Sequence, residues 1–173
     1  MLHEEEDIEE ESLWKKIFVI LGSVFLILLV MSYMFTSYGV REIIAGMLDS
    51  EEVEDNIVDT GEFKVIFEGE TYNDVLEIYE ENLAVETKMC LLGNYDGDYH
   101  VTEVIKPVIY SQEFNQVVSA SCDKDAIIAL HSHPYKRCLA SEQDISNLKQ
   151  SQEVNPNVIV GIICEEDRFS FYS

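Results

Sequence analysis

The sequence predicts an α/β domain with one mixed central sheet flanked by helices, preceded by a single N-terminal transmembrane helix. Three observations lead to this prediction: an uncharged apolar run near the N-terminus, strand-like segments downstream of it, and two segments with helical spacing between those strands. The 173 residues are enough for one compact domain plus an appendage. A formal net charge of −23 argues against nucleic acid as a partner, because the chain has too little positive charge for a broad basic surface.

The first two segments are an acidic tail and the apolar run. Residues 1–16 contain few apolar side chains and are expected to form a disordered or surface tail. Residues 17–38 include the uncharged stretch "IFVILGSVFLILLVMSYMF", whose helix would span about 28 Å against a hydrocarbon thickness of about 30 Å. Trp14, Tyr33 and Tyr38 lie near its ends, as interfacial aromatic residues do. We therefore predict a membrane anchor over residues 17–38, in contact with the lipid bilayer. A cleaved signal peptide is the alternative, but its apolar region would be shorter.

The charges that flank this anchor bear on its orientation. Lys15 and Lys16 precede the run and Arg41 follows it. By the positive-inside rule this balance favours a cytoplasmic N-terminus and a domain on the other side of the membrane. The margin is one charge, so the sequence leaves the orientation open.

Residues 39–61 are predicted to form a juxtamembrane helix that runs into an acidic linker, and residues 62–173 to form the soluble domain. Within the domain, apolar residues alternate or run continuously in the strand segments and recur every three or four positions in the helical ones. A serine followed by acidic residues marks the start of the second helix. The predicted strands are residues 63–67, 88–93, 99–110, 125–133, 157–164 and 168–173, and the predicted helices are residues 71–84 and 141–152.

The chain has four cysteines: Cys90, Cys122, Cys138 and Cys164. None forms a CxxC pair, and their spacing resembles neither a disulfide framework nor a structural zinc site. This pattern favours reduced thiols, although one bridge stays possible. Cys90 and Cys164 are expected to lie in the core, and Cys138 to have a packing role rather than to act as a metal ligand.

The segment "HSHPYKRCLASEQD", residues 131–144, carries the candidate site. His131 and His133 point to the same side of an extended strand, because side chains alternate along it, and Pro134 then ends the strand. Asp144, in the first turn of the next helix, can fold back toward both imidazoles. Two imidazoles and one carboxylate suit Zn²⁺ and leave a fourth position for water. A hydrolase also needs a base, and composition does not choose among the many acidic residues.

The order H-x-H, seven residues, S, two residues, D resembles the motif of the JAMM (MPN-plus, or JAB) zinc metalloprotease family. His131, His133, Ser141 and Asp144 fit it without a gap. The segment "VETKMCLLG" is similar to the family's glutamate followed by a "CGLLLG" strand, and it places Glu86 at the matching position.

This resemblance implies roles for five residues. His131, His133 and Asp144 would hold Zn²⁺, Glu86 would be the general base, and Ser141 would donate a hydrogen bond to the oxyanion. The implied fold is the JAB/MPN type, over residues 62–173. The implied activity is hydrolysis of an isopeptide bond that links a ubiquitin-like or small sulfur-carrier modifier to lysine. The loop "YKR" departs from the family's smaller residues, which puts the substrate in doubt.

Two alternatives accompany this interpretation. One is an extracytoplasmic metallopeptidase with another peptide substrate, and the other is a non-catalytic MPN adaptor that recruits partners. The expected location is a membrane, crossed once. The family's chemistry suggests a cytoplasmic domain, whereas the flanking lysines suggest the opposite.

Overall fold

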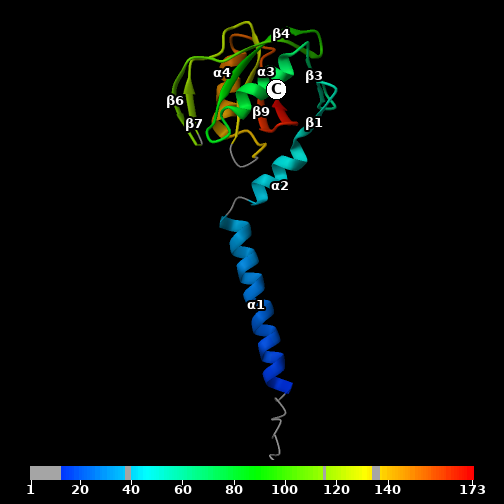
Figure 1. Cartoon of the computed structure of the whole chain (residues 1–173), viewed down its shortest axis with the longest axis vertical. Coiled ribbons are helices and arrows are strands. Elements are labelled where there is room, and N and C mark those ends of the chain that lie inside the picture. The colour runs from blue at the N-terminus through cyan, green and yellow to red at the C-terminus, as the bar shows by residue number, and fades with distance from the viewer. Residues whose placement is uncertain (1–12, 38–39, 115, 134–136) are drawn as a thin grey trace, which may run out of the picture. The chain divides into compact units, whose positions relative to one another are not determined.

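The computed structural model of the chain describes residues 13–37, 40–114, 116–133 and 137–173 (Figure 1). It divides into two compact units, residues 1–41 and residues 42–173. Several residues with assigned roles lie outside the described parts: most of the acidic tail, the interfacial Tyr38 and the strand-ending Pro134.

The first unit contains one long helix, α1 (Leu13–Ser37). Its segment Leu13–Thr36 is long and apolar enough to cross a membrane, by length and composition. Length and composition are therefore compatible with a single-pass anchor.

The second unit begins with a helix and a hairpin. Helix α2 (Val40–Asp49) agrees with the predicted juxtamembrane helix, but β1 (Glu51–Glu54) and β2 (Ile57–Asp59) occupy the segment predicted to be an acidic linker. The two strands pair antiparallel around Asp55 and Asn56, both of which have positive φ, of 52° and 62°. Two consecutive positive φ values are typical of a tight hairpin turn, in which Asp and Asn are favoured. The linker prediction was wrong here because acidic side chains on exposed strand positions concealed the hairpin.

The remaining elements follow the predicted order, except that the strand Gln116–Ser119 was not predicted. They are β3 (Lys64–Phe67), α3 (Thr71–Glu80), β4 (Lys88–Tyr95), β5 (Tyr99–Ile105), β6 (Ile109–Glu113), β7 (Gln116–Ser119), β8 (Ala126–Ser132), α4 (Glu142–Gln152), β9 (Ile159–Glu165) and β10 (Arg168–Tyr172). The long strand predicted over residues 99–110 divides into β5 and β6 around Pro107, which has no N–H to donate to a sheet. Within the described part of the chain, β6 and β7 pair with each other as a separate two-stranded sheet.

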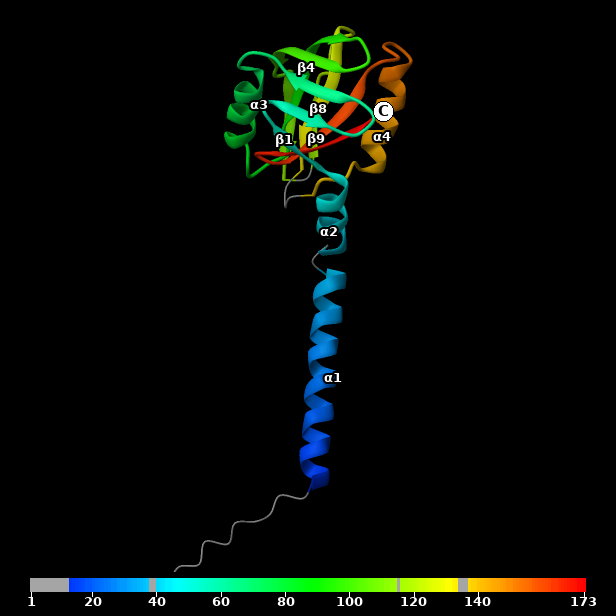
Figure 2. The ribbon, with the colours of Figure 1, turned by 90° about the vertical axis from the view of Figure 1, so that its right-hand side faces the viewer.

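The main sheet is a closed barrel in the order β1-β10-β9-β8-β4-β5-β3-β2 (Figure 2). The predicted mixture of strand directions is present, because β3–β5 and β8–β9 are parallel and the other pairs are antiparallel. The sheet is not an open central layer, however. The unpredicted β1–β2 hairpin pairs with β10 on one side and with β3 on the other, and these pairings close the barrel.

The core of the barrel is apolar, and β8 and β9 are buried over nearly their whole lengths, as their continuous apolar runs predict. Helices α3 and α4 lie on opposite sides of the barrel (Figure 2). Leu148 of α4 packs on Val158, Val160 and Ile162. This packing anchors the helix that carries part of the candidate site.

All four cysteines form disulfides, Cys90–Cys122 and Cys138–Cys164, with Cα–Cα distances of 5.5 and 5.2 Å. The prediction of reduced thiols is therefore wrong. Cys138 is buried and is bonded to Cys164. The two partners of each bridge are 32 and 26 residues apart, so no short cysteine motif in the sequence indicates the pairing. They meet only because the strands and loops that carry them assemble side by side.

Candidate metal centre

The candidate site forms where β4 and β8 lie side by side. His131 is in β8, His133 follows that strand, and Asp144 is in the first turn of α4. Lys88, the first residue of β4, is opposite His131 in the antiparallel pairing. This register brings Glu86, two residues before β4, to the end of β8 that carries the histidines.

Hydrogen bonds on two sides fix the segment that carries Glu86. The Thr87 N–H donates to Ser132 Oγ at 3.0 Å, and the Ser132 N–H donates to the Thr87 carbonyl at 2.9 Å. The Glu86 N–H donates to the Glu113 carbonyl at 3.1 Å, and Gln112 Nε2 donates to the Glu86 carbonyl at 2.9 Å. β8 and the β6–β7 hairpin therefore hold the glutamate's backbone between them.

The side chains of Glu86, His131 and His133 converge. Each offers a ligand atom that lies within 4.8 Å of the other two, so the group could hold a metal ion. Asp144 contacts both imidazoles: its Oδ1 is 3.2 Å from His131 Nε2, and its Oδ2 is 3.6 Å from His133 Nε2. Glu86 is 9% exposed and His131 is 7% exposed. Four side chains from three segments, those before β4, at the end of β8 and at the start of α4, thus meet in a largely buried space.

The imidazole nitrogens provide a test of whether a cation fits. His131 Nε2 and His133 Nδ1 are buried and have no aligned hydrogen-bond partner, even though His131 Nε2 lies close to Asp144. A buried polar atom without a partner costs free energy, and a bond to a cation would remove that cost for the nitrogen that forms it. Imidazole nitrogen and carboxylate oxygen are suitable donors for Zn²⁺ and for several other divalent transition metals. The residues therefore fit a divalent cation.

Burial and charge affect the carboxylates in opposite ways. Burial alone would raise the pKa of Asp144, but the adjacent His131 and His133 and the Ser141 hydroxyl stabilise its ionised form more, so that its pKa lies well below the usual range. Burial raises the pKa of Glu86, the interaction with His131 and His133 lowers it, and the negative charge of Asp144 raises it further. One carboxylate is thus held ionised, while the other binds a proton more readily than usual.

Lys88 is a neighbour of the site that sequence analysis did not identify. Burial lowers the pKa of its ammonium group, and the negative charge of Asp144 opposes that shift. A lysine beginning an apolar strand gives no sequence signal of this placement. Only the pairing of β4 with β8 brings it to the site.

Ser141 is the N-cap of α4, as the helix-start signal predicts. Its Oγ donates to Asp144 Oδ2 at 2.6 Å, its backbone N–H donates to the same oxygen at 2.7 Å, and the Asp144 N–H donates to Ser141 Oγ at 3.2 Å. This reciprocal capping box fixes the direction of the Asp144 carboxylate. The hydroxyl is therefore bound to Asp144, and its role toward an oxyanion stays a prediction.

Substitution Ser141→Ala should reduce kcat while the metal content stays near stoichiometric. The backbone N–H of residue 141 still donates to Asp144, whereas the hydroxyl expected to act on the transition state is lost. Loss of the cap should also lower the free energy of unfolding by about 1 kcal/mol. Metal analysis, steady-state kinetics and denaturant unfolding measure the three effects. Ser141→Thr keeps a capping hydroxyl and is the control. Loss of the metal in Ser141→Ala would make the hydroxyl a structural support instead.

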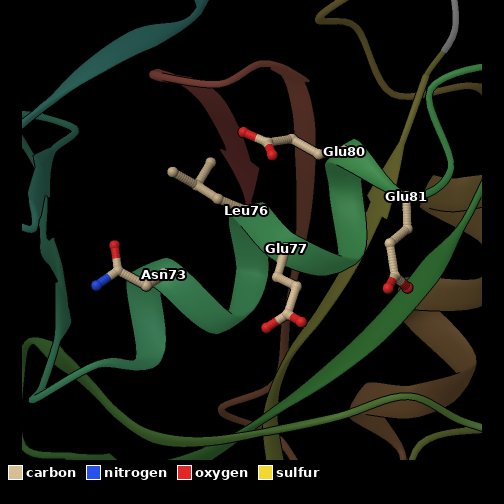
Figure 3. Close-up of a pocket in the computed structure, with 5 residues that line it drawn as sticks. All are labelled: Asn73, Leu76, Glu77, Glu80 and Glu81. Atoms are coloured by element: carbon tan, nitrogen blue, oxygen red, sulfur yellow. The ribbon is translucent and has the colours of Figure 1, made fainter.

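A surface hollow of ≈ 520 Å³ lies elsewhere, along α3 (Figure 3). Its lining comes from successive turns of that helix: Asn73, Leu76, Glu77, Glu80 and Glu81. It contains none of the five predicted site residues, and its acidic lining belongs to the exposed helix surface.

Comparison with protein-family models and with curated proteins finds no match to this chain.

Proposed function

We propose that this chain is a membrane-anchored, zinc-dependent metallopeptidase of the JAMM (MPN-plus) type that hydrolyses peptide or isopeptide bonds. One observation carries the proposal: the carboxylate of Glu86 lies within 4.8 Å of ligand atoms of His131 and His133. The resemblance names this glutamate, which is 45 residues before the first histidine. A coincidental pair of histidines at a strand end would have no reason to meet it.

In this proposal His131 and His133, together with Asp144, would hold the metal. Zinc supplies Lewis acidity and lowers the pKa of water from about 15.7 toward about 7. The Glu86 carboxylate accepts a proton from the attacking water as its oxygen bonds to the carbonyl carbon. As the carbon–nitrogen bond breaks, the same carboxyl passes that proton to the leaving amine. In the metal-free chain burial raises the pKa of Glu86, and a bound cation would act against this shift and favour the carboxylate form that accepts a proton.

The structure also supports a positioning role around these groups. Asp144 is oriented by the capping box of α4, and Glu86 is oriented by backbone bonds to β8 and β6. Fixed elements on both sides reduce the reorganisation needed at the moment of reaction. We therefore propose that the mixed barrel is a domain of the JAB/MPN type.

Metal analysis of the purified full-length chain tests the proposal. We expect about one zinc per chain, and we expect His131→Ala and His133→Ala each to lose it, because each removes one of three ligands. His100→Ala is a matched control, since His100 is a partly exposed histidine that interacts with Glu68 and Asp96. Chelation should abolish cleavage of a fusion in which a ubiquitin-like C-terminus is joined to lysine, or of a peptide library, and added zinc should restore it. A wild-type chain that binds no metal would refute the proposal.

A further inference from the structure

The two disulfides lie around the candidate site. Cys90 is in β4, four residues after Glu86, and its partner Cys122 follows β7. Cys138 precedes the capping box that orients Asp144, and its partner Cys164 is in β9. The segments that carry Glu86 and Asp144 are thus each close to a cross-link.

Three of the four cysteines are almost fully buried: Cys90 is 4% exposed, and Cys138 and Cys164 are each 1% exposed. Cys138 is also covered by α2, because a Cβ atom added to Gly46 would lie 2.8 Å from the Cys138 backbone nitrogen. Bridges enclosed in this way are built into the fold. They differ from exposed cysteine pairs, which can open and close with the folded domain intact.

Buried structural disulfides indicate the cellular compartment in which a domain folds. The cytosol keeps thiols reduced, and outside hyperthermophiles stable structural disulfides form and persist in secreted domains, the periplasm and at cell surfaces. Every cysteine of this chain is used in one of the two bridges. A domain that folded in the cytosol would instead hold four thiols at these positions, three of them buried.

The charges that flank α1 point independently to the same side. Lys15 and Lys16 lie at its N-terminal end, and Arg41 is in α2, beyond its C-terminal end. The side with more lysine and arginine tends to remain in the cytoplasm, while acidic residues have little influence. α1 is the one helix in the described part of the chain that meets the criteria for a membrane span. Its two ends therefore face opposite compartments if it spans the bilayer.

We infer that the barrel domain faces the oxidising side of the membrane, and that its substrates are polypeptides outside the cytosol rather than cytosolic ubiquitin-like modifiers. The substrate part rests on the proposed peptidase function. The orientation part rests only on the bridges and on the flanking charges. Cleavage of α1 as a signal sequence would deliver the barrel to the same side.

The test uses the full chain in a bacterium with a reducing cytoplasm and an oxidising periplasm. A protease site followed by an epitope tag is fused after Ser173, and protease is added to spheroplasts before and after detergent lysis. Free thiols are blocked in denaturant, the protein is reduced, and newly exposed thiols are labelled with a large maleimide. We expect the tag to be removed from intact spheroplasts, and four labels per chain to appear only after reduction. The same tag placed before Met1 should be protected until lysis.

The variant Lys15→Gln/Lys16→Gln links the two observations. It leaves Arg41 as the flanking positive charge, so more chains should insert with the C-terminal tag protected. In those inverted chains the cysteines should accept a label without reduction. Inverted chains that still lack free thiols would overturn the inference. A wild-type tag removed only after lysis, or wild-type thiols that are free before reduction, would do the same. Neither assay measures metal binding or hydrolysis, so these results are independent of whether the proposed peptidase is correct.

Discussion

Substitution of Glu86 by glutamine should lower kcat by roughly 10²–10⁴-fold, the usual contribution of a positioned general base. Glutamine has nearly the same shape, but its amide does not accept the proton of the attacking water. The measurement is single-turnover cleavage of the fusion or peptide substrate by the zinc-loaded full-length chain in detergent. Glu81→Gln is the matched control, because Glu81 is an exposed glutamate at the end of α3 and should leave the rate unchanged.

The same variant should not weaken the fold. Burial raises the pKa of Glu86, so protonation of this group favours the folded chain. That contribution is present below the unfolded-state pKa of about 4.3 and is lost as the pH rises through the folded-state pKa. At pH 7 a neutral glutamine should therefore leave the metal-free chain at least as stable as the wild type. A large loss of stability would mean that a slow rate reflects misfolding, and a wild-type rate would refute the assignment of the base.

The second large effect concerns stability. Replacement of Cys138 and Cys164 together by alanine should lower the free energy of unfolding by about 3–4 kcal/mol. A cross-link between residues 26 apart restricts the unfolded chain by about that amount in the chain-entropy account. Near-ultraviolet circular dichroism of the tyrosines should monitor the transition, because Trp14, the one tryptophan of the chain, lies in α1 and is not part of the barrel.

The variant that lacks Cys138 and Cys164 should also bind zinc more weakly, because the loop before Ser141 loses its covalent link to β9. The variant Cys90→Ala/Cys122→Ala should lose a similar amount of stability, since its bridge joins residues 32 positions apart. Reducing agent should destabilise the wild-type chain as well. A wild-type chain with the same unfolding midpoint with and without reductant would contradict the presence of stabilising bridges.

Much of the fold could be predicted from local pattern. Continuous apolar runs marked β8 and β9, alternation marked β3 and β10, and helical spacing marked α3. The serine and acidic residues at the start of α4 marked the beginning of this helix, which the structure confirms and forms with a capping box. These features depend on residues within a few positions of one another, and this is why a sequence shows them.

Closure of the barrel depended on contacts between distant segments. The hairpin of β1 and β2 has acidic, largely exposed residues and a turn at Asp55 and Asn56, and it becomes recognisable as part of the sheet only through its pairing with β3 and β10. The disulfides show the same limit. Their partners are too far apart in the chain for spacing to indicate them.

The sequence by itself determined the apolar segment that is long enough to cross a membrane, most strands and helices, and the residue types in the candidate site. The histidines and Asp144 lie close together in the chain, so their spacing was enough to predict that they approach one another. Local pattern did not single out Glu86, which only the family resemblance named. Tertiary structure decided that Glu86 meets the histidines, that Lys88 lies beside them, that the cysteines pair and that the sheet closes. The physical reason is that these contacts are set by strand register across the barrel, and register is a property of the assembled sheet that no single segment carries.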